Sequence, residues 1–160
     1  MDEVRSGAFS VFTPPEIDEF KKLVLSEGRV GRRTLPGLMI SARCLVMLLH
    51  AGQVIGTAAL KSPNNTYRKR VFRLSKVSEQ ESQFPYEMGW VVVHPDHRQR
   101  RYSHRLVEAA LADIAAGVYA TSQDRDTAMH RTLERSGFRK SGSPYPSTGN
   151  PGSKIFLFVR

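Results

Sequence analysis

The stretch that decides the fold is GWVVVHPDHRQRRYSHRLVEAAL, Gly89–Leu111. Within Tyr86–Val93 the pattern alternates and then becomes wholly apolar, as in a strand buried on both faces. His94–Asp96 interrupts it, and from about Arg101 apolar residues recur at spacings of three and four, which is typical of a helix with one buried side. The segment therefore predicts a buried strand, a basic turn and a helix.

The basic turn, Arg98–Ser103, leads directly into the start of the expected helix. The first N–H groups of a helix have no carbonyl partner within it, and the helix dipole is positive at this end. Such a turn can hold a phosphate group. Taken alone, these residues also fit a solvated basic helix start.

Outward from this segment, the sequence predicts alternating strands and helices. We expect a short strand at Ala8–Phe12, a helix from Thr13 to Gly28, a loop at Arg29–Gly37, a hairpin at Cys44–Leu60, a strand at Val118–Thr121, a helix at Asp126–Ser136, a loop at Ser141–Ser153 and a last strand at Ile155–Val159. The basic segment Arg68–Lys76 is left open between helix and loop. This order predicts an α/β fold with a mixed central β-sheet flanked by helices, in a single domain over residues 1–160.

Composition restricts the class of protein. Hydrophobic residues make up 40% and charged residues 24%, which excludes a disordered tail, a fibre or a membrane bundle. The net charge of +9 attracts polyanions. The only cysteine, Cys44, cannot form an internal disulfide, and the most apolar run, Cys44–Leu49, is far shorter than a membrane span. We expect a cytoplasmic protein with no membrane partner.

Two segments resemble the GNAT acetyltransferase superfamily, whose members bind acetyl-CoA with a strand, a turn of the form Arg/Gln-x-x-Gly-x-Gly/Ala and a helix. They are Gly89–Leu111, quoted above, and ATSQDRDTAMHRTLERSGF, Ala120–Phe138. They stand in the family's order, and the flanking elements extend the resemblance over nearly the whole chain. The resemblance implies a GNAT-like fold, acetyl-CoA as acyl donor and an amine, of a kind it does not specify, as acceptor.

The resemblance also assigns residues to the cofactor. Main-chain groups of Val91, Val92 and Val93 would face the pantetheine arm, and Arg98 matches the family's opening Arg or Gln. Amides of the following residues would bind the pyrophosphate: Gln99, Arg100, Arg101, Tyr102 and Ser103. Asp126, in the second segment, stands where an asparagine is common and is a further cofactor-binding candidate.

Three further positions depart from the family pattern. Arg101 replaces the first glycine of the turn and Ser103 replaces the second. The Arg101 side chain could crowd a backbone that approaches phosphate, or it could turn outward or pair with a cofactor phosphate. Leu133 occupies the place where many members carry the tyrosine that protonates the leaving thiolate.

Acyl transfer from a thioester to an amine needs a proton acceptor and a way to discharge the thiolate. Glu87 matches a strand position where several family members use a carboxylate as base, although a salt-bridged glutamate is the alternative. By family analogy Tyr145 is the candidate acid, with Tyr102 and Tyr119 as alternatives. The five histidines and the single cysteine share no metal-ligand spacing, so we expect no metal.

A second basic cluster, Arg68–Lys76, is not explained by a cofactor. With Tyr67 and Phe72 it interleaves cations and aromatic rings, which suits RNA or a single strand, although a solvated basic face fits as well. Two functions therefore stay open. The first is an acyl-CoA-dependent N-acyltransferase; the alternative is a catalytically altered GNAT-fold protein that binds or modifies nucleic acid, tRNA or DNA, through its basic surface. The apolar run Ile155–Phe158 fits core burial or pairing in a homodimer.

Overall fold

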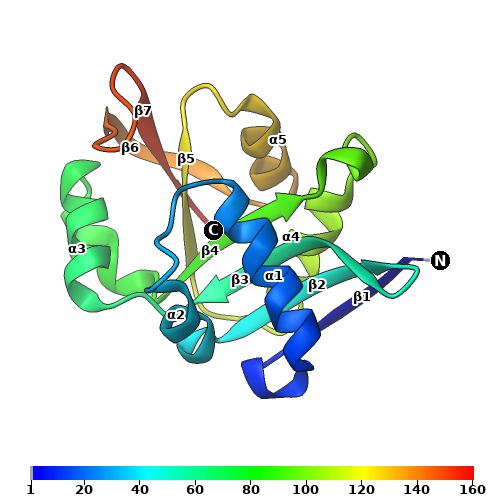
Figure 1. Ribbon diagram of the computed structural model, residues 1–160. Coiled ribbons are helices and arrows are strands. Elements are labelled where there is room, and N and C mark those ends of the chain that lie inside the picture. Colours follow the sequence, from blue (N-terminus) through cyan, green and yellow to red (C-terminus); the bar gives the residue numbers. More distant parts are fainter. Residues whose placement is uncertain (1) are drawn as a thin grey trace. The chain divides into compact units, whose positions relative to one another are not determined.

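The structure is a computed structural model that describes residues 2–160 (Figure 1). The chain divides into two compact units. The first contains the described residues up to Ser62 together with Met88–Asp113, and the second contains Pro63–Glu87 and Ile114–Arg160. Strand β4 (Tyr86–Val93) contributes its start to the second unit and the rest to the first. The strands form a seven-stranded mixed sheet in the order β1-β2-β3-β4-β5-β7-β6.

The first unit is built on antiparallel strands β1 (Asp2–Gly7), β2 (Cys44–His50) and β3 (Gln53–Lys61). Ala51 and Gly52 join β2 to β3, and both have the positive φ that a tight hairpin turn requires. Helices α1 (Pro14–Ser26) and α2 (Leu35–Ser41) cover one face of these strands, and α4 (Tyr102–Leu111) covers the other (Figure 1).

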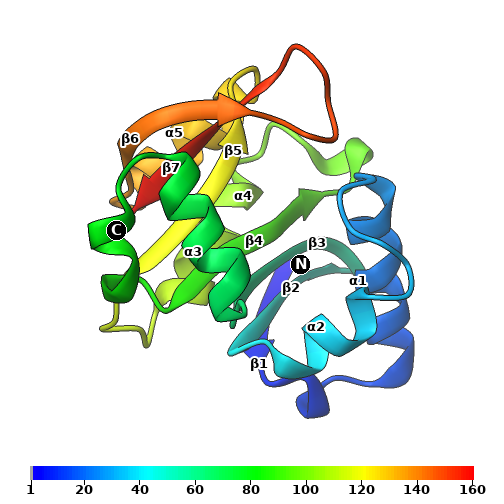
Figure 2. The same ribbon diagram turned by 90° about the vertical axis from the view of Figure 1, so that its left-hand side faces the viewer.

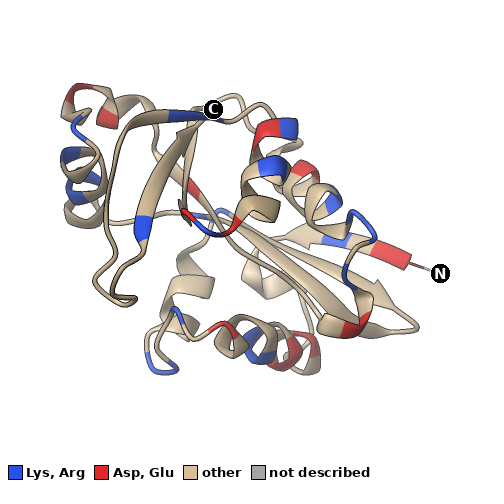
Figure 3. Ribbon diagram, turned by 90° about the horizontal axis from the view of Figure 1, so that it is seen from above, with Lys and Arg blue, Asp and Glu red and all other residues tan. Residues whose placement is uncertain are grey.

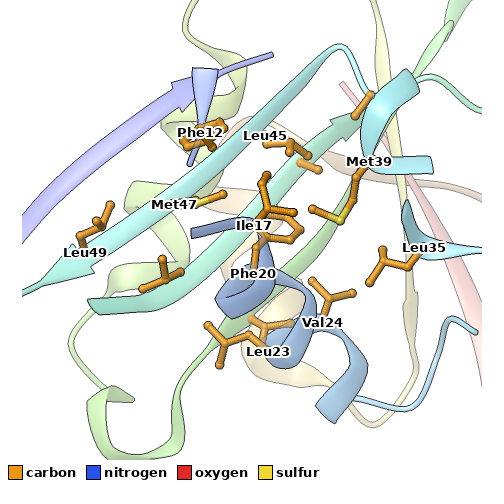
Figure 4. Close-up of a cluster of buried hydrophobic side chains, with 14 residues drawn as sticks. Phe12, Ile17, Phe20, Leu23, Val24, Leu35, Met39, Leu45, Met47 and Leu49 are labelled. Carbon is orange, nitrogen blue, oxygen red and sulfur yellow. The ribbon is translucent and has the colours of Figure 1, made fainter. Parts of the chain in front are cut away.

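The core of the first unit lies between α1, α2 and the sheet (Figure 4). Its stripe along α1 consists of Ile17, Phe20, Leu23 and Val24, at the helical spacing that the sequence shows. A capping box starts the helix, since Thr13 Oγ1 accepts the Glu16 N–H while Glu16 Oε2 accepts the Thr13 N–H. Local capping and apolar periodicity thus act together to position α1 on the sheet.

The second unit holds the remaining elements: α3 (Asn65–Leu74), β5 (Val118–Gln123), α5 (Thr127–Arg135), β6 (Arg139–Pro146) and β7 (Lys154–Val159). The start of β4 pairs in parallel with β5, and β7 pairs antiparallel with both β5 and β6. Figure 2 shows α3 in front of β5 and β7. On this face the Phe72 ring contacts Tyr119 at 5.3 Å, and on the opposite face the α5 residue His130 contacts Phe158 at 5.1 Å between ring centroids.

The structure confirms the α/β class with a mixed sheet flanked by helices, and it confirms the strand at Tyr86–Val93 and the hairpin. It also decides that the basic segment after Asn64 is helical, because Asn64 caps α3 by accepting the Tyr67 N–H at 2.8 Å. Division into domains stays a prediction. Along the described residues no helix is long and apolar enough to cross a bilayer.

Three local expectations are wrong. Ala8–Phe12 is not a strand, since Phe9–Val11 forms a 3-10 turn and the edge strand is β1, whose mixed sequence shows no clean alternation. The expected loop at Arg29–Gly37 ends early, because α2 begins at Leu35. The expected loop at Ser141–Ser153 contains most of β6, an exposed edge strand with Gly142, Pro144 and Pro146, whose ladder to β7 is irregular between Ser141 and Tyr145.

Candidate active site

Strand β4 carries an irregularity just before the residues predicted to face the pantetheine arm. Trp90 has a φ of 52°, a left-handed conformation that a bulky residue in a strand rarely adopts. The buried Thr57 hydroxyl donates to the Trp90 carbonyl at 2.7 Å, and the Trp90 ring packs edge-on against Phe20. These contacts hold the kink in place, so the hydrogen-bonding direction of the main chain changes immediately before Val91–Val93.

The turn after β4 is tied back to the sheet at both ends. The His94 N–H donates to the Ile55 carbonyl at 2.8 Å, and Pro95–His97 forms one 3-10 turn. Arg98 Nε then donates to the Val93 carbonyl at 3.0 Å. The Arg98 side chain therefore closes the turn onto the end of β4, a structural role that accounts for an arginine at this position without any ligand.

Two residues of the turn adopt left-handed backbone conformations: Gln99 with φ 64° and Arg101 with φ 59°. Arg101 is the position where the family pattern has its first glycine, and a positive φ is the conformation that glycine adopts without strain. The chain thus keeps a glycine-like backbone with an arginine, at a cost of about 1 kcal/mol. Arg101 is exposed, so its side chain is not packed into the turn.

Helix α4 starts directly after Arg101 and has no side-chain cap. Its first N–H groups have no carbonyl partner within the helix. The Tyr102 side chain is buried, and its hydroxyl donates to Asp2, which also bonds His50 at 2.7 Å. These hydrogen bonds, from Tyr102 first and His50 second, lower the pKa of Asp2 to about 2. Because the Tyr102 hydroxyl is hydrogen-bonded to Asp2, it is a poor candidate for the catalytic acid. Only the main-chain N–H of Tyr102 remains as a group that could bind a ligand.

Glu87 is buried in the second unit beside two phenols, the partly exposed Tyr67 and the buried Tyr119. The residue is 3% exposed, and its carboxylate accepts a hydrogen bond from the Tyr67 hydroxyl of α3 at 3.1 Å. Tyr119 stands beside it on β5 in the parallel register. The Tyr119 hydroxyl is buried and has no hydrogen-bond partner within residues 2–160. Burial, and secondly the Glu87 charge, raise the pKa of both Tyr67 and Tyr119, so both phenols are neutral at physiological pH.

Tyr145, the candidate acid, is half-buried on β6. Burial raises its pKa to about 12; the Arg70 guanidinium acts in the opposite direction and the Glu87 charge adds to the increase. Tyr145 is therefore protonated at neutral pH and lies within electrostatic reach of Glu87. The structure thus groups Glu87 and Tyr145 in one unit, together with Tyr67, which sequence reasoning had assigned only to a basic surface.

The remaining candidates have structural partners. Asp126 caps α5, with Oδ1 accepting the Met129 N–H at 3.2 Å. Leu133 is 1% exposed and belongs to the core, so its side chain does not reach solvent. His130 pairs with the Gln123 carbonyl at 2.9 Å. Across the part of the chain that the structure describes, no group of three or more His, Cys, Asp or Glu side chains is arranged to hold a metal ion.

Two features of the site were not found from the sequence. Tyr67 carried a signal, because an Asn64 cap fixes the start of α3 and a helix starting there places Tyr67 in its first turn. The left-handed backbone conformation of Trp90 had no signal in the sequence, since it depends on contacts with Thr57 and Phe20, which are distant along the chain.

A known protein family matches most of this chain. The model of the Acetyltransferase (GNAT) family matches residues 13–138. No curated protein matches the chain.

Solved structures resemble the chain over its whole length. A crystal structure of an acyl-CoA N-acyltransferase from Pseudomonas aeruginosa is 17% identical, covers 100% of this chain and 99% of its own, and has a TM-score of 0.70. A GNAT family acetyltransferase from Elizabethkingia anophelis with acetyl-CoA bound gives 10% identity, 99% and 96% coverage and a TM-score of 0.65. The ribosomal-protein-S18-alanine N-acetyltransferase from Escherichia coli is 13% identical, covers 99% of this chain and 92% of its own, and has a TM-score of 0.67. At these identities the likeness shows a shared fold.

Proposed function

Because this chain belongs to the GNAT acetyltransferase family, we propose that it is an N-acetyltransferase that moves the acetyl group of acetyl-CoA to an amine. The observation that carries the proposal is the turn before α4. There a left-handed, exposed Arg101 is followed by a helix start without a side-chain cap. A diphosphate would supply the anion that such a helix start lacks.

The residues of the turn fit the acyl donor. The N–H groups of Gln99–Ser103 would bind the pyrophosphate, and the exposed Arg100 and Arg101 would balance its charge. Val91–Val93, beyond the kink at Trp90, would offer main-chain groups to the pantetheine arm.

Acetyl-CoA supplies the acetyl group as an activated thioester. Glu87 would accept the proton that the amine nitrogen loses as its bond to the acetyl carbon forms. Tyr145 would donate a hydrogen bond to the sulfur as the carbon–sulfur bond breaks. Its pKa of about 12 favours stabilising the thiolate over complete proton transfer, because the phenol is a much weaker acid than a thiol. Leu133 lies in the core at the position of the usual acid, which supports a different residue in this role.

The first test is the change Glu87→Gln, with Glu79→Gln as matched control. Glu79 is an exposed glutamate in the same unit. The measurement is release of free thiol from acetyl-CoA with a panel of primary amines, together with the Kd for CoA by calorimetry. Loss of the base should lower kcat by about a hundredfold or more at an unchanged Kd, while Glu79→Gln keeps wild-type turnover.

Two results would contradict the proposal. Equal kcat for Glu87→Gln and wild type would remove Glu87 as base. If calorimetry detects no heat of binding at millimolar CoA, the proposed acyltransferase activity is excluded. That result would favour the alternative, a GNAT-fold protein without catalytic activity.

A further inference from the structure

Helix α3 carries a group of cations that the proposed acetyltransferase does not use. Figure 3 shows blue bands grouped on the ribbon of α3, on the left. Lys69, Arg70 and Arg73 on α3 and Lys76, two residues after its end, are all exposed, and no acidic residue lies within Asn65–Leu74. We call these four residues the α3 basic face.

The neighbouring Arg68 differs from the α3 basic face. Its Nε donates to Glu81 at 2.6 Å and its Nη2 donates to Asn65 at 3.0 Å, so its charge is already compensated. In contrast, no carboxylate of residues 2–160 forms an ion pair with any residue of the α3 basic face. Three positive charges on this short helix, and a fourth just after its end, thus have no negative partner within the described chain.

A hollow of about 270 Å³ lies beside this face, lined by Lys69, Arg73, Ser78 and Glu81. Lys69 and Arg73 are four residues apart, so their side chains project from the same side of the helix. Ser78 adds a hydroxyl that can donate. Glu81 is the one acid in the hollow, and its charge is paired with Arg68. The hollow is therefore suited to a group with negative charge and several acceptor oxygens, such as a phosphate.

The helix holds these side chains on a rigid support. Val71 and Phe72 are buried, and the Phe72 ring stacks on Phe84 at 5.7 Å between centroids. From Lys69 to Arg73 the face extends about 6 Å at helical rise, and Lys76 lies beyond the end of the helix, so the face fits successive phosphates of a polymer. Tyr67, three residues before Arg70, is 37% exposed and offers part of its ring next to the cations. Cations beside an exposed aromatic ring favour an unpaired strand over an acidic protein surface.

We propose that the α3 basic face, with the hollow at Ser78, binds the sugar–phosphate backbone of single-stranded RNA. None of its residues is among those assigned to acetyl-CoA, although the Arg70 charge opposes the burial that raises the pKa of the proposed acid Tyr145. The proposal goes beyond the proposed acetyl transfer without depending on it.

The test is binding of a fluorescein-labelled oligouridine of about 20 nucleotides, measured by anisotropy over a series of salt concentrations. Four contacted phosphates should give a log–log slope of about −2.8 for the wild type. In Lys69→Ala/Arg73→Ala two contacts are lost, so binding should weaken by about tenfold or more and the slope should become shallower by about 1.4.

The matched control is Arg131→Ala/Arg135→Ala. This pair on α5 has the same spacing, exposure and charge loss and lies in the same unit. It should leave affinity within about twofold. Both double variants change exposed side chains, and unchanged thermal unfolding and an unchanged Kd for CoA would show that the fold and the proposed cofactor site are intact.

Three results would overturn the inference. Equal weakening by the two double variants would mean that only net charge matters. Competition by oligoglutamate of equal charge as effective as that by RNA would indicate an acidic protein instead. Displacement of the oligonucleotide by CoA would place the RNA on the turn before α4. Success or failure of acetyl transfer with the Glu87 variant is independent of each of these results.

Discussion

Helices α4 and α5 begin in opposite ways, although the family resemblance assigns both of their starts to the cofactor. At α5 the Asp126 carboxylate accepts the Met129 N–H, so the helix start already has an anion of its own. At α4 there is no side-chain cap, and the preceding residue is a left-handed arginine. A helix start that is capped by a carboxylate repels phosphate, whereas an uncapped one with cations attracts it. The comparison supports our proposal that the diphosphate binds at the start of α4, while Asp126 stabilises the start of α5.

The largest effect is expected when the start of α4 is given an acidic residue like the one at the start of α5. In Arg101→Asp a carboxylate replaces a guanidinium at the helix start, in a residue type that tolerates the left-handed conformation. We expect the Kd for CoA to rise by about thirtyfold, which corresponds to about 2 kcal/mol. Calorimetry measures this change. The control Arg32→Asp makes the same charge change at another exposed site of the same unit, and equal weakening by both would reduce the effect to net charge.

Removing the cap of α5 should lower the stability of the fold without changing the affinity for CoA. Asp126→Ala loses the side-chain acceptor for the Met129 N–H, so the free energy of unfolding should fall by about 1 kcal/mol. Urea unfolding measures the loss, and the Kd for CoA should stay within about twofold of wild type. Asp126→Ser keeps a capping oxygen and should recover most of the stability. If both changes weaken CoA binding to the same extent, the carboxylate contacts the cofactor as the family resemblance implies.

The smallest effect is expected from restoring the glycine of the family pattern. Arg101→Gly removes the strain of a positive φ, so the free energy of unfolding should rise by about 0.5–1 kcal/mol. The lost charge should weaken CoA binding by about two- to fivefold, the range of an exposed ion pair. Lys76→Gly is the control, because Lys76 also has a positive φ but lies in the second unit. It should stabilise the chain without changing the Kd for CoA. Tighter CoA binding by Arg101→Gly would show that the arginine obstructs the turn.

The parts of the fold that the sequence predicted are those determined by local pattern. The apolar run of β4, the capping box of α1 and the turn between β2 and β3 are each encoded within a few residues. The strands β1 and β6 were missed because edge strands alternate weakly, and β6 contains glycine and proline residues that are typical of loops.

In the candidate site, too, only the features determined by local sequence could be predicted. Arg101 was recognised as a departure from a glycine pattern, but its positive φ, which explains why the family uses glycine there, required the structure. The contact between Tyr67 and Glu87 joins residues 20 positions apart and depends on how α3 packs on the sheet. Such contacts depend on tertiary packing and leave no periodic trace in the sequence.

The most direct measurement is a titration of the isotope-labelled protein with CoA, followed by the backbone amide resonances. We expect the amide resonances of Gln99–Ser103 to shift and to saturate at one equivalent of CoA, while those of Thr127–Met129 at the start of α5 stay in place. Shifts at the start of α5, or a turn before α4 that stays unchanged at saturating CoA, would contradict this expectation.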